Sequence, residues 1–200
     1  MVARAEASGR GWGECRIELP APESWLVFDL DTVDPQVWAR SVAEEHVGAD
    51  APADRRDAFA EDVLWYWAAA IRQRALCAAL LVPPGSSVLA SYTVRELHVS
   101  PELLCLEAFR REAELAEGPF FGKPAISEVD LPMGSAIRVH RLEPSAPESA
   151  DGEVLEGVAH YIVPRLHPVA LESRLLWTSL GLGDELATVA DALAESIRLV

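Results

Sequence analysis

The sequence predicts a single α+β domain in which one antiparallel β-sheet is flanked by helices and a C-terminal amphipathic helix packs on the sheet. Three observations support this fold class. Short alternating or apolar segments follow one another with Pro- and Gly-containing turns between them, which is typical of strands paired as hairpins. The regular alternation of strand and helix that builds a parallel sheet is missing. The final segment, residues 184–199, repeats apolar side chains at helical spacing.

Seven segments are predicted to be strands because they alternate polar and apolar residues or form short apolar runs. They cover residues 14–19, 25–29, 75–82, 88–99, 137–142, 158–163 and 169–178. Prolines end the first and third of these segments, at Pro20 and Pro83. Residues 143–153 are rich in Pro, Ser, Ala and acidic residues, so we expect a flexible surface loop between two strands there.

Four segments are predicted to be helices, over residues 34–48, 54–74, 101–117 and 184–199. The first begins with a suitable N-cap at Asp34, followed by Pro35 at the first helical position. In the last segment, Asp184 lies near the N-terminus and Arg198 in the final turn. Both charges have the sign that the helix dipole favours, so this is the best-supported helix of the chain.

The second helix carries an aromatic cluster. Phe59, Val63 and Trp67 share one face, and Trp65 and Tyr66 widen the apolar surface. A helix that is apolar nearly all round is either buried on both sides or offers its extra face to another chain. Core packing is the simpler interpretation, and a partner-binding surface is the functional one.

The composition predicts an acidic globular protein. The chain has 17 Lys and Arg against 32 Asp and Glu, a net charge of −15, and half of its residues are hydrophobic. A negative field repels phosphate backbones, so nucleic acid is not expected as a partner. The charge fits simple solubility or the steering of a basic partner. Every basic residue except Lys123 is Arg, a bias associated with GC-rich bacterial coding.

The cysteines and the chain start predict a cytoplasmic protein. Cys15, Cys77 and Cys105 lie far apart without a metal-site spacing, so we expect reduced core thiols and no metal or cofactor. No secretory signal is recognisable, and the longest apolar run is too short to cross a membrane as a helix. Residues 1–12 are predicted to be a flexible N-terminus and residues 13–200 a single domain.

A second candidate site is a polar cluster on the sheet. If residues 137–142 pair with the strand that contains residues 158–163, His140 and His160 can lie side by side. Alternation then places Arg138, Glu172 and Arg174 on the same face. Such a cluster could bind a ligand, sense pH or contact a peptide, whereas a solvated face with cross-strand ion pairs is the simpler interpretation.

Residues 27–32, Val-Phe-Asp-Leu-Asp-Thr, resemble the first motif of haloacid-dehalogenase-type phosphohydrolases. In that motif a strand delivers two aspartates, here Asp29 and Asp31, as nucleophile and general acid beside a magnesium ion. Thr93, Lys123 and an acidic ligand at Asp184 would complete the site. Asp184 opens a helix instead, and the parallel sheet is missing. A solvated turn at the two aspartates is therefore the simpler interpretation.

Two further features resemble the Mog1/PsbP-like fold. One is an N-terminal hairpin in which residues 17–20, Ile-Glu-Leu-Pro, lead to Trp25. The other is a closing unit of a hairpin, residues 157–164 and 171–178, and a terminal helix, residues 184–197. This family includes a Ran-binding protein, photosystem II extrinsic subunits, bacterial lipoproteins and chaperones for secreted effectors. The resemblance implies an α/β/α sandwich that binds another protein without catalysis, and it transfers no functional residue.

We therefore expect a non-catalytic protein-interaction domain, such as an adaptor, a secretion-type chaperone or an assembly subunit, with an unidentified protein partner. A homodimer is compatible with the sequence. Two alternatives stay open: a magnesium-dependent phosphohydrolase that uses Asp29 and Asp31, and a small-molecule-binding module on the sheet face. The candidate partner-binding residues are Trp65, Tyr66, Trp67, Arg138, His140, His160, Glu172 and Arg174.

Overall fold

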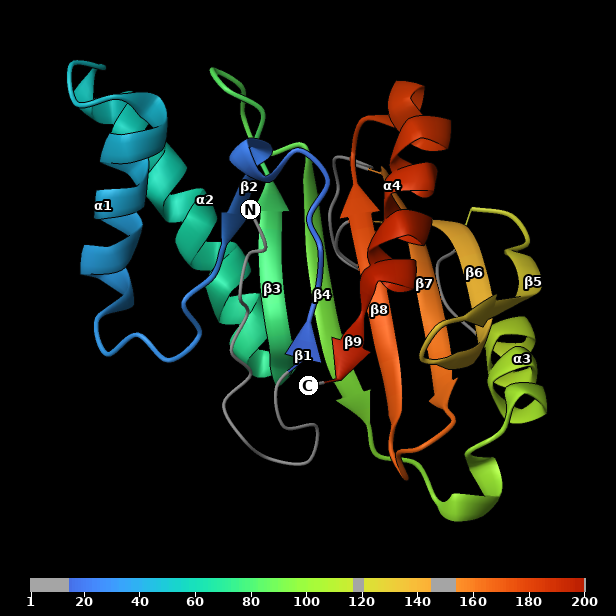
Figure 1. Ribbon diagram of the computed structural model, residues 1–200. Helices are drawn as coiled ribbons and strands as arrows, with labels where there is room; N and C mark the ends of the chain where they lie inside the picture. Colours follow the sequence, from blue (N-terminus) through green and yellow to red (C-terminus); the bar gives the residue numbers. More distant parts are fainter. Residues whose placement is uncertain (1–14, 117–120, 145–153, 200) are drawn as a thin grey trace.

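The computed structural model describes residues 15–116, 121–144 and 154–199, which contain a seven-stranded, fully antiparallel sheet (Figure 1). The strand order is β2-β3-β4-β8-β7-β6-β5, so β2 and β5 form the two edges. The strands are Trp25–Val27 (β2), Ala75–Leu81 (β3), Ala90–Leu97 (β4), Ala125–Leu131 (β5), Gly134–Pro144 (β6), Val154–Pro164 (β7) and Ala170–Trp177 (β8). A separate short pair joins Cys15–Arg16 (β1) to Arg198–Leu199 (β9) near the chain ends.

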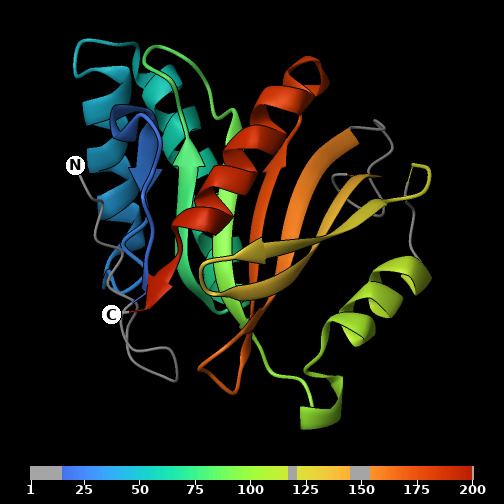
Figure 2. The same cartoon turned by 45° about the vertical axis from the view of Figure 1, so that its right-hand side comes forward.

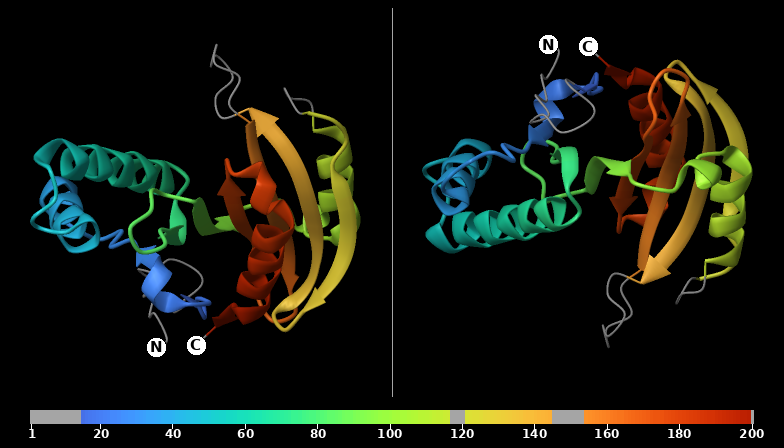
Figure 3. Two further views of the ribbon diagram at one scale, coloured as in Figure 1. Left: turned by 90° about the horizontal axis from the view of Figure 1, so that it is seen from above. Right: turned by 90° about the horizontal axis from the view of Figure 1, so that it is seen from below.

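In the described part of the chain, four α-helices flank the sheet on both faces. Their bounds are Pro35–Val47 (α1), Ala53–Arg72 (α2), Leu106–Leu115 (α3) and Gly183–Ser196 (α4). Figure 2 shows α4 lying across one face, and Figure 3 shows the sheet curving around α4 with α3 on the outer side. The predicted fold class, an antiparallel sheet flanked by helices with a C-terminal helix on the sheet, is confirmed.

The largest core lies between α4 and the sheet. Leu186, Ala190 and Leu193 of α4 are buried against side chains that point from one face of the strands, among them Tyr92 and Trp177. Burial of this helix face removes apolar surface from water, which is the main stabilising contribution to folding. The apolar residues at helical spacing in the last segment therefore pack the helix on the sheet, as predicted.

The opposite face carries two smaller cores, one at each side of the sheet. At the β3 side, Val63 and Ala70 of α2 pack against Ala78 and Leu80 of β3, and α1 packs on the outside of α2. At the β6 side, α3 packs on Ile137 and Val139, and its Phe109 stacks on Tyr161 with ring centroids 5.8 Å apart. The two helices α2 and α3 thus cover the margins of this face.

The central part of the face between α2 and α3 is less covered than the face under α4. Along β4, Ala90, Tyr92 and Val94 point towards α4 and are buried, whereas Ser91 and Thr93 point the other way and are only half-buried. Since successive side chains of a strand point to opposite faces, this pattern reports a difference between the faces. We call this surface of β4, β8, β7 and the adjoining end of β6 the open face.

One strand of the seven-stranded sheet was not predicted from the sequence. Ala125–Leu131 forms the edge strand β5, paired with β6 from Ala125 opposite His140 to Leu131 opposite Gly134. Most of its side chains are exposed, so the segment lacks the apolar run that identified the central strands. Strands β6 and β7 are also longer than expected: β6 extends through Pro144 into the predicted loop at residues 143–153, and β7 begins at Val154 directly after it. Residues 145–153 lie outside the described part of the chain.

Two further expectations are corrected. The terminal helix ends at Ser196 rather than Leu199, because Ile197 is extended, with φ −60° and ψ 128°, and Arg198 pairs with Arg16 in the small β1–β9 ladder. Cys105 is exposed at the N-cap of α3, whereas Cys15 and Cys77 are buried as predicted. The prediction of a flexible N-terminus at residues 1–12 falls outside the described residues.

Candidate functional site

A pocket of about 430 Å³ lies between α2 and the open face. Its α2 wall is formed by Trp65, Tyr66 and Ala69, and its floor includes Thr93 of β4 and Arg174 of β8. The remaining lining is mixed: Leu155 and Leu176 are apolar, and Gln73 and Ser91 are polar. A pocket of this volume lies within the usual size range of ligand-binding sites.

The aromatic cluster of α2 divides between the pocket and the core. Trp65 is 61% exposed and meets Tyr66 edge-to-face, with ring centroids 4.8 Å apart. Trp67 points elsewhere: its indole Nε1 donates a hydrogen bond to the carbonyl oxygen of Asp29 at 2.9 Å, and its ring packs against the α1–α2 core. Trp65 is therefore available to a ligand, Tyr66 lines the pocket and also packs against the same core as Trp67, and Trp67 joins α2 to the segment after β2.

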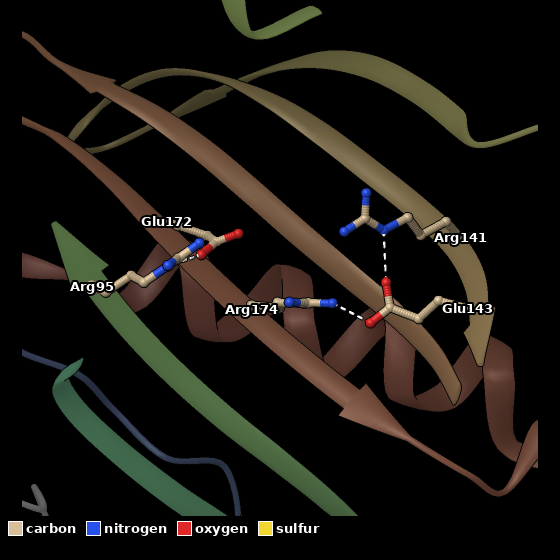
Figure 4. Close-up of polar contacts among 5 residues, drawn as sticks. All are labelled: Arg95, Arg141, Glu143, Glu172 and Arg174. Atoms are coloured by element: carbon tan, nitrogen blue, oxygen red, sulfur yellow. Dashed lines mark hydrogen bonds and ion pairs between the residues drawn. The ribbon is translucent and has the colours of Figure 1, made fainter. Parts of the chain in front are cut away.

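From Arg174 at the pocket floor, a charged cluster continues over the open face (Figure 4). It consists of three arginines and two glutamates: Arg95, Arg141, Glu143, Glu172 and Arg174. Arg95 pairs with Glu172 on the neighbouring strand β8. Glu143 accepts hydrogen bonds from two arginines, Arg141 at 3.0 Å and Arg174. We call these five residues the arginine cluster.

Burial within the arginine cluster is uneven. The Glu172 side chain is only 3% exposed and that of Glu143 is 14%, whereas Arg95 retains 33% and Arg174 20%. Glu172 is therefore buried beneath a more exposed Arg95, whereas Glu143 and its two arginines are all partly buried. The cluster thus places three guanidinium groups around two carboxylates.

The charges of the arginine cluster affect the pKa of a neighbouring phenol, that of Tyr161 on β7. Burial raises the pKa of its phenol, and Glu172 raises it further, while Arg141, Arg174 and Arg95 act in the opposite direction. All four charged groups therefore act on the same ring, and Tyr161 lies opposite Glu172 on the open face.

The predicted histidine cluster lies on the other face, towards α4. Arg138 is directly opposite His160, and His140 lies on the same side two residues further along β6. Glu172 and Arg174 do not join them, because Glu172 is opposite Tyr161 and so belongs to the open face. The expectation that all five residues share one face is therefore wrong for Glu172 and Arg174.

His160 joins α4 to the sheet, whereas His140 contacts a residue of the neighbouring strand β7. Asp191 of α4 accepts a hydrogen bond from Arg138 Nε at 2.7 Å and contacts His160 Nε2 at 3.0 Å, and His160 is 1% exposed. Burial alone would raise the pKa of Asp191, but the hydrogen bonds with His160 and Arg138 outweigh it and lower this pKa. His140 contacts Glu156 at 2.7 Å, and Glu156 also accepts the indole N–H of Trp177 at 3.0 Å.

The residues of the phosphohydrolase alternative are far apart. Asp29 and Asp31 follow the edge strand β2, and Lys123 precedes the opposite edge strand β5. Six strand spacings of about 4.8 Å separate these edges. Both aspartates are exposed, and Asp29 Oδ1 accepts the backbone N–H of Asp31 at 3.2 Å in a turn. The pocket that this alternative requires is not assembled.

Arg95, Arg141 and Glu143 were not among the candidate site residues predicted from the sequence. A signal was present in β4, where Ser91, Thr93 and Arg95 alternate with buried apolar residues and so mark a polar surface. Glu143 was assigned to the loop because its neighbours are Pro, Ser and Ala. The order of strands in the sheet decides which charges lie beside Arg95, and hydrophobic periodicity does not reveal this order.

Comparison with known proteins adds no assignment: the chain matches no protein-family model and no curated protein. The resemblance to the Mog1/PsbP-like fold therefore stays a prediction. Within the described residues, no group of three or more His, Cys, Asp or Glu side chains is arranged to hold a metal ion. In the same part of the chain, no helix is long and apolar enough to cross a membrane.

Proposed function

We propose that this protein is a non-catalytic interaction domain that binds a protein partner at the pocket between α2 and the open face. The observation that carries the proposal is Trp65, an exposed indole at a pocket wall. Tryptophan is among the residues that contribute most to protein–protein binding, because it buries a large rigid surface at low entropic cost. The half-buried open face beside it extends the contact area.

A pull-down from the native host with the tagged protein tests this proposal. Trp65→Ala is expected to weaken capture of a stoichiometric partner about 30-fold, the effect of losing about 2 kcal/mol at a binding hot spot. Ile71→Ala is the matched control, since Ile71 is exposed on the same helix but does not line the pocket. Equal loss in both variants, or no loss in either, would exclude the pocket as the binding surface.

Trp67→Ala is unsuitable as the binding variant. Its removal deletes the hydrogen bond to Asp29 and opens the α1–α2 core, so loss of capture would report unfolding. Thermal unfolding of Trp65→Ala should stay near the wild-type transition, because most of its side chain is already in water.

A second candidate function is a small-molecule-binding module in the same pocket. The volume of about 430 Å³ favours it, since ligand pockets commonly span roughly 300–1,000 Å³. Its location differs from the face of His140 and His160 considered from the sequence. Thermal-shift screening with small organic acids tests it: a rise in the unfolding temperature that Trp65→Ala and Arg174→Gln both abolish would support this candidate.

A further inference from the structure

We propose that the partner binds through a basic segment whose anchor is an arginine or lysine side chain. The anchor enters the pocket against α2, where its cationic group lies on the indole of Trp65 and pairs with the carboxylate of Asp62. This inference rests on the proposed function and adds the chemistry of the partner.

Asp62 and Trp65 belong to one surface of α2. Both residues line the pocket, and they are three positions apart in the helix. Side chains at this spacing are neighbours on the same helix face. Glu61, four positions before Trp65, is a second neighbour by the same rule and is also exposed. The exposed indole therefore has two carboxylates one turn before it on the helix.

The carboxylate of Asp62 is free to pair with a ligand. Among the residues that the structure describes, none forms an ion pair or a side-chain hydrogen bond with Asp62. The helix itself offers no cation, because positions 58, 59, 65 and 66, three and four residues away, carry no basic side chain. A carboxylate of this kind is a strong acceptor for a guanidinium or ammonium group.

Trp65 adds an attraction that is selective for cations. The face of an aromatic ring attracts an ammonium or guanidinium group within about 6 Å of its centroid, and tryptophan does so more strongly than tyrosine or phenylalanine. Trp65 is 61% exposed, so a ligand group can cover its ring. A cation at this wall of the pocket would interact with the indole and with Asp62 together.

The mixed lining of the pocket suits the whole of a basic side chain. Leu155 and Leu176 are apolar, whereas Gln73 and Ser91 are polar. Arginine and lysine bury an aliphatic stem on apolar surface and keep a charged end among polar groups or water. A purely apolar anchor would displace water from the polar groups without replacing their hydrogen bonds, which costs binding energy.

The charge of the molecule also favours a basic partner. The chain carries −15, and such a field accelerates the association of a positively charged partner. Among the described residues that line the pocket, Arg174 is the only basic one, and its charge is offset by Glu143. An acidic anchor would instead meet Asp62 at the α2 wall and be repelled by the net charge.

Binding of two fluorescein-labelled peptide pools tests the proposal. The pools have the same length and the same mixture of uncharged residues around a central position, which is arginine in one pool and citrulline, its uncharged analogue, in the other. Fluorescence anisotropy at physiological ionic strength, where distant charges are screened, should show the arginine pool binding at least about tenfold more tightly, the effect of one charge-assisted contact.

Substitutions on α2 separate the anchor site from general charge. Asp62→Asn should remove most of the preference for the arginine pool, because it removes the charge and keeps the size of the side chain. Asp57→Asn is the matched control: Asp57 is exposed on the same helix but does not line the pocket, so the preference should stay unchanged. Trp65→Leu should weaken the arginine pool more than the citrulline pool, since leucine keeps an apolar contact and lacks the aromatic face.

The outcomes distinguish this inference from the proposed function. Equal affinity for the two pools, no binding of the arginine pool, or a preference that survives in Asp62→Asn overturns the basic anchor, while Trp65-dependent capture of a host partner still supports the interaction domain. Equal loss of the preference in Asp62→Asn and Asp57→Asn also overturns it, because general charge would then explain the binding. If Trp65→Ala leaves host capture unchanged, the proposed function itself fails.

Discussion

Single atoms decide how closely the strands of this sheet can approach. Gly134 begins β6 opposite Pro164, and a Cβ atom there would overlap the backbone carbonyl of Val163 and lie 2.9 Å from the Cα of Pro164. These neighbours are backbone atoms, so the contact cannot be relieved by turning a side chain. The glycine is required here by steric contact, which a one-dimensional pattern does not reveal.

We expect Gly134→Ala to lower the free energy of unfolding by about 1–3 kcal/mol, the usual cost of forcing an extra carbon into a packed site. Urea unfolding followed by circular dichroism measures it. Gly181→Ala is the control, because a Cβ at Gly181 meets nothing within 4 Å. Equal stability of the two variants would contradict the close approach of β6 and β7.

At the scale of elements, the ionic contacts of α4 hold the terminal helix to the sheet. Asp191 joins this helix to Arg138 on β6 and His160 on β7. The pKa of Asp191 is lower in the folded chain than its ordinary value near 3.8. A carboxyl group with a lowered pKa stabilises the fold above its unfolded pKa, and this contribution is lost as the pH falls through the folded pKa.

Asp191→Asn should therefore be less stable than wild type at neutral pH, and the difference should shrink below about pH 4. Urea unfolding across this pH range measures the difference in unfolding free energy between the two proteins. The effect of the other carboxyl groups cancels in this difference. Glu195→Gln, an exposed substitution one turn further along α4, should show no comparable pH-dependent difference. A constant difference for Asp191→Asn would mean that its charge does not stabilise the helix contact.

At the scale of the whole molecule, the main core contains two cysteines from distant parts of the chain. Cys15 of β1 and Cys77 of β3 both lie in the core beneath α4, and burial raises the pKa of Cys15 to about 11. The thiolate is the reactive form of cysteine, and a raised pKa makes it rare at neutral pH. Cys105 lies on the surface at the start of α3.

Alkylation with iodoacetamide under native conditions should therefore label Cys105 and spare Cys15 and Cys77, as measured by peptide mass spectrometry. Protection of the two core thiols should end at the same urea concentration as the global unfolding transition. Labelling of Cys15 well before that transition would show that the β1–β9 pair opens separately from the sheet.

The sequence alone determined what depends on neighbours along the chain. Asp34 caps α1 as predicted, with Oδ1 accepting the N–H of Val37 at 3.0 Å, and the amphipathic spacing of α4 identified the helix that covers the sheet. The sequence also allowed two interpretations of the aromatic cluster that contains Trp65: core packing or a partner-binding surface. Such features rest on propensity, capping and periodicity, which act over a few residues.

Only the tertiary structure decided which distant residues meet. The polar edge strand β5 is held by its register with β6, and Arg198 leaves the helix to pair with Arg16. Strand order and register place Glu172 and Arg174 beside Arg95 and Glu143 instead of beside the histidines. A shift of one residue in register exchanges the two faces of a strand, so the composition of the open face follows from long-range pairing that local pattern does not specify.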